Sequence, residues 1–179
     1  MNLKRYLLGV SLFSVAVLGL AGCGTGEKTA SNVWRVGTDA SYAPFGFQDE
    51  KSHEYVGFDI DIIRAIAQAQ GHEVTIKNLN FDGLIPALQT GDLDIAISDM
   101  TINEERAKTV DFTDSYYKAG LSMVVRADET RINSFDDLEG LRVGVTIGST
   151  GAEAARGIPN ADLHEFSTIS DAFLDLYNG

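Results

Sequence analysis

Cysteine, proline and histidine are scarce in this chain of 179 residues. Its single cysteine, Cys23, excludes a disulfide within the chain. The three histidines are far apart and none has the spacing of metal ligands: His53, His72 and His164. No Ser–His–Asp or paired-carboxylate pattern stands out either. The sequence therefore predicts no metal, no cofactor and no catalytic residue.

Positive charge is also in short supply. The chain has 14 Lys and Arg against 26 Asp and Glu, which gives a formal net charge of −12. Such an acidic chain repels the phosphates of nucleic acid and argues against a basic patch for anionic lipid heads. It leaves the sign of a ligand open, because that is decided inside the site. We therefore exclude nucleic acid as a partner.

Long hydrophobic runs are limited to one, Leu7 to Leu20, which follows Lys4 and Arg5. The run is too short and too close to the N-terminus for a structural membrane helix, and it fits a secretory signal. No later run qualifies as a membrane-spanning helix. We therefore expect an exported chain.

Small residues precede the only cysteine in the sequence LAGC, which ends at Cys23. This stretch resembles the lipobox of bacterial lipoproteins, which implies a signal peptide at residues 1–22 and acylation of Cys23. Removing residues 1–22 makes the formal charge two units more negative. Two or more acyl chains suffice for stable anchoring. Ordinary signal cleavage beside an incidental cysteine is the alternative.

Residues 23–32 are rich in small and polar side chains and have no hydrophobic period. We expect the lipidated cysteine followed by a flexible tether. The protein would then lie outside the cytoplasm, anchored to the cell membrane through Cys23.

Strand and helix patterns alternate after the tether. Apolar positions recur at helical spacing in 59–70, and residues 73–79 alternate as a strand does. The expected order is strand 33–37, a ribbon with a turn at 49–52, helix 59–70, strand 73–79, helix 81–90 and strand 93–97. This alternation is typical of an α/β layer with a parallel sheet.

A second unit follows residue 115. We expect a strand at Leu121 to Arg126, a short capped helix at Ser134 to Leu138, a strand at 142–146, a helix from Ala152, a strand at 163–166 and a helix at 170–177. The sequence stops at Gly179, where a next strand is expected, so the second sheet looks unfinished.

Polar side chains stand where three of these strands end. Thr38 and Asp39 follow the first strand, Ser98 to Thr101 the third, and Gly148 to Thr150 the first strand of the second unit. Ligands of open parallel sheets bind beyond the carboxyl ends of the strands. We therefore expect these groups to share one site.

The residue types indicate what such a site would hold. Arg106 offers a planar fork suited to a carboxylate, and Thr101 and Thr150 add neutral donors. Asp39 and Asp99 suit a cation. Apolar walls would come from Tyr42 and Phe81. This combination predicts a site for a free amino acid.

Each residue alone has a plainer explanation. Arg106 is then a solvated helix residue paired with a neighbouring carboxylate. Ser98, Thr101 and Asp39 are then turn or cap residues, and Tyr42 and Phe81 belong to the core. Only their joint placement at strand ends favours a ligand site.

Several long motifs appear in order along the chain. The segments are TDASYAPF (38–45), YVGFDID (55–61), FDGLIPAL (81–88), MTINEER (100–106), DFTDSYY (111–117) and GSTG (148–151). They resemble the successive motifs of the family 3 extracellular solute-binding proteins, the amino-acid receptors of ABC importers. The resemblance covers essentially all of residues 33–179.

This resemblance implies an α/β fold of the periplasmic-binding-protein-like (type II) class. Such proteins have two lobes with mainly parallel sheets and helices on both faces, and they close on the ligand about a hinge. Here lobe 1 would be residues 33–115, the hinge crossing 116–120, and 121–179 a partial, incomplete lobe 2.

The resemblance also assigns roles. Arg106, Thr101 and Thr150 would grip the ligand α-carboxylate, and Asp39 would face its ammonium or another cationic group. Tyr42 and Phe81 would sandwich the side chain. Ser98 and Asp99 would line the pocket, partly through backbone carbonyls.

Three departures from the family stand out. Asp99 stands where relatives usually carry a small residue, and Gly46 stands where a number of them carry a selective acid. Relatives also continue well beyond Gly179, so we expect a truncated or fragmentary chain. Residues 24–179 alone should then show no tight amino-acid binding by calorimetry.

The expected ligand is arginine or lysine, with glutamine or histidine as alternatives, and the expected partner is an ABC transporter permease. We expect a monomer and no enzymatic activity. A dehydratase-like enzyme on the same fold is one rival, but no general acid or base is evident. A ligand-sensing receptor module is the other, but the lipobox argues against it.

Overall fold

The computed structural model describes residues 32–179. The signal peptide predicted at 1–22, the acylation predicted at Cys23 and nearly all of the tether lie outside these residues. Within them, no helix is both long and apolar enough to cross a membrane.

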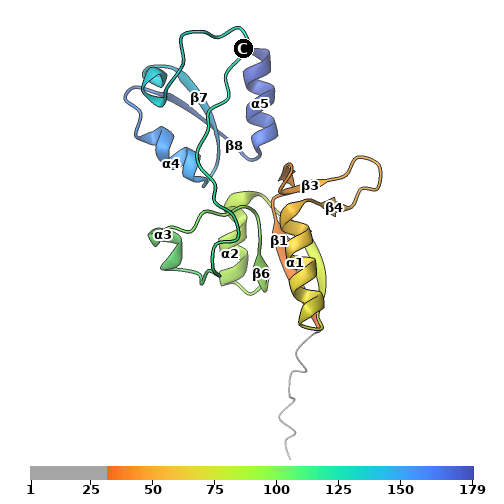
Figure 1. Ribbon diagram of the computed structural model, residues 1–179. Coiled ribbons are helices and arrows are strands. Elements are labelled where there is room, and N and C mark those ends of the chain that lie inside the picture. The colour runs from red at the N-terminus through yellow and green to blue at the C-terminus, as the bar shows by residue number, and fades with distance from the viewer. Residues whose placement is uncertain (1–31) are drawn as a thin grey trace, which may run out of the picture. The chain divides into compact units, whose positions relative to one another are not determined.

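Three parallel strands form the first sheet, in the order β5-β1-β6 (Figure 1). They are β1 (Val33–Thr38), β5 (Glu73–Asn78) and β6 (Ile95–Ala96). Strand β1 lies in the middle and pairs with β5 along its whole length. Strand β6 is shorter than the expected 93–97, although the amides of Asp94 and Ile97 still donate to carbonyls of β1. The predicted parallel α/β layer is confirmed.

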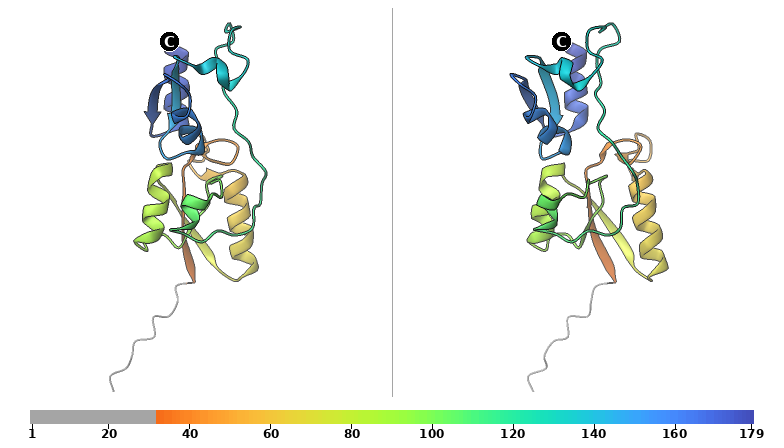
Figure 2. Two further views of the ribbon diagram at one scale, coloured as in Figure 1. Left: turned by 90° about the vertical axis from the view of Figure 1, so that its left-hand side faces the viewer. Right: turned by 60° about the vertical axis from the view of Figure 1, so that its left-hand side comes forward.

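Helices cover both faces of this sheet (Figure 2). Neighbouring strand residues point to opposite faces, and on β1 Val36 packs against Ile63 of α1 (Phe58–Ala69). A side chain at Gly37 would instead meet Leu84, the first residue of α2 (Leu84–Gln89), at 3.0 Å. The two helices therefore lie on opposite sides of β1.

An antiparallel ribbon connects β1 to α1. Its strands are β2 (Ser41–Tyr42), β3 (Gly46–Gln48) and β4 (Tyr55–Val56). In the expected turn, the Asp49 carboxylate accepts hydrogen bonds from the amides of Lys51 and Ser52. The ribbon begins where the polar residues after β1 stand, so it helps to frame the carboxyl end of that strand.

The second sheet has two parallel strands, β7 (Arg142–Thr146) and β8 (Asp162–Phe166). Its core is made of small residues, since Val145 packs with Ala152 and Ala155. These alanines belong to α4 (Thr150–Arg156), and α5 (Ile169–Asn178) also packs on β7. The strands and helices expected here are therefore present.

Shorter turns complete the described chain: the 3₁₀ helices η1 (Phe81–Gly83) and η2 (Phe135–Leu138), and α3 (Glu104–Ala107). The helix expected after Ser134 is a 3₁₀ turn, closed by a capping box in which the Asp137 carboxylate accepts from the Ser134 amide at 2.8 Å.

The strand expected at Leu121 to Arg126 was wrong. The segment has no regular structure, and Leu121 and Val124 are exposed. An apolar run becomes a strand only when another strand satisfies its amides and carbonyls. Nothing within residues 32–179 pairs with this segment. The lobe and hinge boundaries remain predictions.

Candidate functional site

The carboxyl ends of β1 and β6 bring two predicted residues together. The Ser98 hydroxyl accepts a hydrogen bond from the Asp39 amide at 3.0 Å, and both residues are buried. The Asp39 carboxylate also accepts from the Ser41 amide at 3.1 Å, as a turn-capping aspartate does. Asp39 therefore combines a turn contact with a position at the strand end.

Arg106 is buried, only 7% exposed, as is Asp39. Asn103 caps its short helix α3, because the Asn103 side chain accepts from the Arg106 amide at 2.9 Å. The guanidinium donates through Nη1 to the Thr101 carbonyl at 2.7 Å and through Nη2 to the Gly148 carbonyl at 2.9 Å. The interpretation of Arg106 as a solvated helix residue is therefore wrong.

The Arg106 guanidinium has no ion-pair partner within the described part of the chain, where no carboxylate oxygen lies within 4.0 Å of it. Burial lowers its pKa, while the more distant Glu153 carboxylate acts in the opposite direction. Arginine nevertheless stays charged in proteins. A buried cation held by carbonyls alone, with further N–H donors unused, is suited to an incoming anion.

Phe81 supports this arginine. It begins η1, and its ring centre lies 5.4 Å from the Arg106 guanidinium carbon. A cation above an aromatic face is stabilised by the ring quadrupole. Phe81 therefore holds the arginine from one side.

Tyr42, the other predicted wall, is 46% exposed and stacks on Phe45 with ring centres 6.1 Å apart. Among residues 32–179, no ring contact or hydrogen bond joins Tyr42 to Phe81. The two predicted walls are not joined in this structure.

The two predicted threonines differ in how they relate to Arg106. The Thr101 residue is exposed, and its carbonyl rather than its hydroxyl binds the arginine. Thr150 is the first residue of α4, which Ser149 caps by accepting from the Ala152 amide at 3.1 Å. Thr150 lies two residues after Gly148, whose carbonyl binds Arg106. Main-chain contacts therefore bring Thr101 and the residue two before Thr150 to one guanidinium, and the carboxylate grip remains a prediction.

Gly148 allows this close approach. Its φ of 73° lies in the left-handed region, which favours glycine. A side chain there would also come within 3.2 Å of the Asp82 side chain. The contact with Arg106 therefore depends on a residue without a side chain.

Asp99 lies over a buried carboxylate that the sequence did not reveal. The Asp99 amide donates to Asp59 Oδ2 at 2.7 Å, and the Tyr116 hydroxyl donates to Asp59 Oδ1 at 3.0 Å. Asp59 is fully buried in the first turn of α1. Acidic residues are common at helix N-termini, so the sequence held no signal for this role.

Burial changes the acidity of all three groups. It raises the pKa of Asp59, and it raises the pKa of Asp99, where the nearby Asp59 charge adds to the effect. Burial, followed by the Asp59 charge, also raises the pKa of the Tyr116 hydroxyl. Each of the three groups therefore holds its proton more strongly than it would in water.

Two hydroxyls near Asp39 are buried without a hydrogen-bond partner in the described residues, those of Thr38 and Ser41. Gly46 lies against them, because a side chain there would begin 3.0 Å from the Thr38 hydroxyl. Buried hydroxyls normally find partners. These two add unused polar groups to the same strand end.

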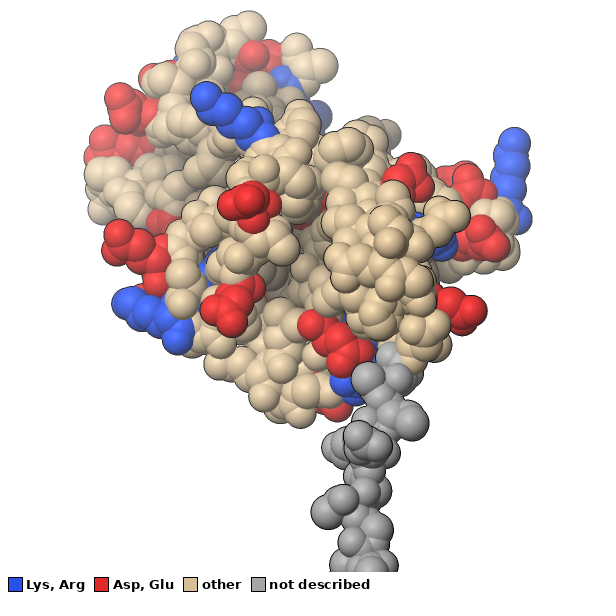
Figure 3. Space-filling view, turned by 60° about the horizontal axis from the view of Figure 1, so that its bottom comes forward, with Lys and Arg blue, Asp and Glu red and all other residues tan. Residues whose placement is uncertain are grey.

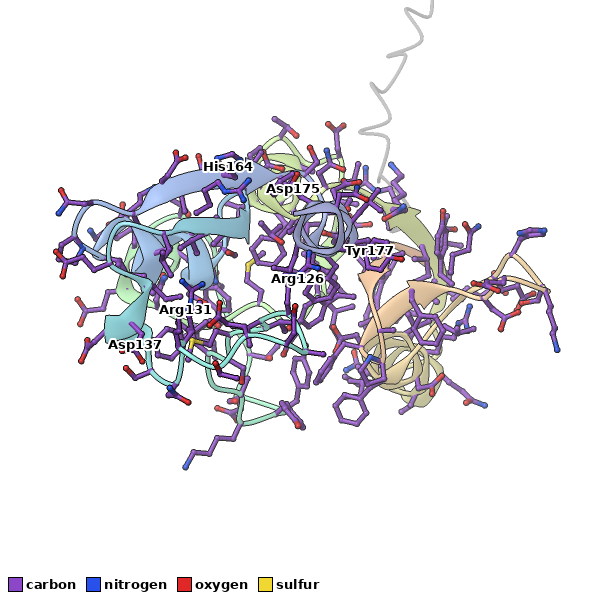
Figure 4. All side chains as sticks on the ribbon, turned by 90° about the horizontal axis from the view of Figure 1, so that it is seen from above. Arg126, Arg131, Asp137, His164, Asp175 and Tyr177 are labelled. Carbon is purple, nitrogen blue, oxygen red and sulfur yellow. The ribbon has the colours of Figure 1, made fainter. Side chains whose placement is uncertain are left out.

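A cavity of about 430 Å³ lies elsewhere, between residues 124–128 and α5, and contains none of the predicted site residues. Its two charged groups, Arg126 and Asp128, form an ion pair at 3.5 Å, and Arg126 also donates to the carbonyls of Leu176 and Tyr177. Figure 4 shows Arg126 and Tyr177 near α5. Because its polar groups are engaged and its walls are apolar, this cavity is a weaker candidate than the strand-end site.

The described residues hold no cluster of three or more possible metal ligands. On the face in Figure 3, acidic side chains are spread among fewer basic ones. This distribution agrees with the acidic composition.

Comparison with known proteins identifies the class. Residues 34–178 match the family described as bacterial extracellular solute-binding proteins, family 3. The chain belongs to this family, and its fold is that of the type II periplasmic binding proteins.

Two curated relatives and one solved structure illustrate the match. A probable histidine-binding protein of Campylobacter jejuni is 35% identical over 158 residues, 85% of this chain and 61% of the relative. The arginine-binding extracellular protein ArtP of Bacillus subtilis is 34% identical over 157 residues, 86% of this chain and 60% of the relative. An ancestral arginine-binding protein bound to arginine has a TM-score of 0.81 and 44% identity, over 83% of this chain and 66% of that one.

The chain thus spans about three fifths of the length of these curated relatives. The relatives are named as binding proteins, not as enzymes, in agreement with the prediction that the chain is not an enzyme.

Proposed function

We propose that this chain belongs to an extracytoplasmic lipoprotein that captures a free polar amino acid, arginine or lysine in preference, and delivers it to an ABC importer. The observation that carries the proposal is the buried Arg106 guanidinium, which has carbonyl partners and an aromatic support but no carboxylate partner.

The α-carboxylate of the ligand is the group that fits Arg106. A buried guanidinium binds a carboxylate through two parallel hydrogen bonds. In this proposal Thr101 and Thr150 add donors to the same carboxylate. The ligand then supplies the missing counter-charge, which makes the bound state favourable.

The acidic residues that follow β1 and β6, Asp39 and Asp99, suit the cationic part of the ligand. Asp39 lies beside Ser98, and Asp99 follows directly. Two carboxylates favour arginine or lysine over a neutral side chain. The named relatives include arginine-binding, histidine-binding and glutamine-binding proteins, so glutamine and histidine remain the alternative ligands.

Export, anchoring and the transporter partner rest on the leader sequence and the family. The lipobox-like sequence before Cys23 supports lipidation, and family 3 proteins are described as extracellular. In this proposal the protein acts as a monomer at the cell membrane and passes its ligand to a permease.

A thermal-shift screen of the twenty amino acids tests the proposal. The protein is expressed from its complete open reading frame except for the predicted leader and Cys23, so that it begins at Gly24. A ligand at about 100 times its Kd adds about 2.7 kcal/mol to the free energy of unfolding. We expect the largest rise in Tm with arginine or lysine.

Agmatine, which is arginine without its carboxylate, is the matched control. It should give little or no shift if Arg106 holds the carboxylate. A folded protein that none of the twenty amino acids stabilises would contradict the proposal. Calorimetry on residues 24–179 alone tests separately whether this part binds without the remainder of the family's length.

A further inference from the structure

Asp59 is a fully buried carboxylate that the proposed ligand contacts do not use. No Lys, Arg or His nitrogen within residues 32–179 lies in ion-pair range of it. A buried charge is costly unless other groups satisfy it. Asp59 is satisfied by two hydrogen bonds, and these come from two distant segments.

One oxygen serves the loop after β6. Asp59 Oδ2 accepts from the Asp99 amide at 2.7 Å, a distance typical of a hydrogen bond to a charged group. The backbone of Asp99 has a φ of 47°, a left-handed conformation that few residues with side chains adopt. The hydrogen bond holds the loop in this conformation.

This loop carries two of the contacts that organise the site. Ser98, one residue before Asp99, binds the Asp39 amide through its hydroxyl. Thr101, two residues after it, binds Arg106 through its carbonyl. A change in the Asp99 backbone therefore redirects both the strand-end contact and the arginine.

The other oxygen serves the segment proposed as the hinge crossing. Asp59 Oδ1 accepts from the Tyr116 hydroxyl at 3.0 Å. The Tyr116 ring also lies against Phe58, with ring centres 6.3 Å apart. Tyr116 is thus fastened to the first turn of α1 at the residue where the crossing is expected to begin.

We propose that Asp59 is a positioning residue that couples the ligand-binding loop 98–101 to the crossing segment at Tyr116. A single carboxylate holds both, so movement of either segment alters the hydrogen bond to the other. The ligand-affinity part of this inference rests on the proposed function; the coupling itself does not.

Asp59→Asn tests the coupling with little change of shape. An amide is neutral and offers one acceptor oxygen where the carboxylate offers two, so both donors lose their charged partner and one of them loses its acceptor. Hydrogen bonds to charged groups are the strong ones. We expect affinity for L-arginine, measured by calorimetry, to fall at least about tenfold.

Asp61→Asn is the matched control. Asp61 is in the same first turn of α1 and carries the same charge, but it is exposed. Its replacement should change the affinity for L-arginine by no more than about twofold, which is well below the tenfold loss expected for Asp59→Asn. Equal losses in both variants would show a general effect of charge at the helix N-terminus and would overturn the proposal.

Tyr116→Phe gives a readout that needs no ligand and removes one oxygen atom. The Asp99 amide lies close to the Tyr116 hydroxyl itself, so the amides of Ser98 and Thr101 in the same loop are the reporters. If the two hydrogen bonds are coupled through Asp59, the NMR signals of these two amides move in this variant. Unchanged Ser98 and Thr101 amides in a folded Tyr116→Phe protein would overturn the coupling. The Tyr116→Phe experiment also tests the coupling if the Asp59→Asn protein does not fold.

The two arms separate the two ideas. If no variant, the wild type included, binds an amino acid, the proposed function fails while the NMR result still decides the coupling. If the wild type binds and the Ser98 and Thr101 signals are unchanged in Tyr116→Phe, the coupling fails and the proposed function stands.

Discussion

The two sheets of this molecule differ in what fills their cores and in what they give to the site. The first sheet packs branched side chains, Val36, Ile63 and Ile97, and at its strand ends the Ser98 side chain binds the Asp39 amide. The second packs alanines against Val145 and binds Arg106 with a main-chain carbonyl, that of Gly148.

The apolar surface differs as well. Around the second sheet, Phe173, Leu174 and Tyr177 of α5 are exposed, as are Leu121 and Val124 before it. Around the first sheet, the exposed rings of Phe58, Tyr116 and Tyr117 contact one another. The first half of the described chain therefore has the core of branched side chains and supplies most of the side chains of the candidate site.

Core substitutions should show the largest difference in stability. Ile63→Ala, at a residue that is 4% exposed, should lower the free energy of unfolding by about 2–5 kcal/mol because it leaves a cavity. Val145→Ala in the second core removes only two methyl groups and should cost about 1.5 kcal/mol. Urea denaturation measures both, and a larger loss at Val145 would reverse the comparison.

Ligand affinity should depend more on Arg106 than on Thr150 of the second half. Arg106→Lys keeps the charge but loses the planar fork, and L-arginine affinity should fall about 100-fold, since truncating a buried charged partner costs 2–5 kcal/mol. Thr150→Val should cost about tenfold, in the range of one hydrogen bond to a charged group. Calorimetry measures both.

Lys108→Met is the control for Arg106→Lys, because Lys108 is exposed next to the same short helix and pairs with Glu105. It should leave the affinity unchanged. A loss at Thr150 as large as that at Arg106 would place the main anchor in the second half.

Selectivity should depend on Asp99. Asp99→Gly removes the carboxylate while suiting the left-handed backbone, where φ is 47°. Arginine affinity should fall about tenfold more than glutamine affinity if the carboxylate faces the cationic group, a difference of about 1.4 kcal/mol. Equal losses for the two ligands, measured side by side, would reject that role.

The same substitution should affect stability in a pH-dependent way. Burial and then Asp59 raise the pKa of Asp99, so its contribution is most favourable below its unfolded pKa of about 3.9 and is lost as pH rises through the folded value. Asp99→Gly should therefore raise Tm by about 2 °C at pH 7 relative to wild type, an effect of roughly 0.5–1 kcal/mol, and the gain should shrink towards pH 4. A gain that is independent of pH would exclude the carboxylate as its cause.

Surface ion pairs should show the smallest effects. The Arg35 side chain binds Asp94 through Nε at 2.9 Å and Nη2 at 2.6 Å, and its hydrogen bonds hold the pKa of Asp94 down at about 2. This contribution is present above pH of about 4 and is lost as pH falls through about 2. Asp94→Asn should lower Tm by about 2 °C at pH 7, since exposed pairs are weak, and the difference should shrink as pH falls through about 2.

Glu165→Gln is the matching change in the second half, where Glu165 pairs with Arg156. It should have a similar or smaller effect on Tm. A clearly larger effect would show that the second sheet relies on its surface charge more than the first does.

Much of the fold could be predicted from periodic patterns of apolar residues. Such patterns are reliable for strands and helices that pair or pack with elements nearby in the sequence. The strand at 33–37, the helix from 59 and the parallel order were predicted correctly. The strand at Leu121 to Arg126 was not, because its apolar pattern is local while a strand also requires a neighbour, and no described residue provides one.

The site was predictable as a set of residue types at strand ends, and Asp39, Ser98, Thr101 and Arg106 do lie in contact with one another in two groups. Asp59 and the Gly148 carbonyl were missed. A helix N-terminal acid looks ordinary in sequence, and a main-chain oxygen has no sequence signature at all. Both accept hydrogen bonds from residues that are far away in the sequence and come close only in the folded chain.

The Gly148 contact has a consequence for how this protein tolerates change. Apart from Thr150, for which a side-chain role is proposed, residues near Gly148 can vary as long as the main chain keeps its course. At Gly148 itself any side chain meets Asp82 and an unfavourable φ. A mutational scan should therefore find one intolerant glycine in this turn. Among side chains, only its partner Arg106 would reveal the contact that this glycine makes.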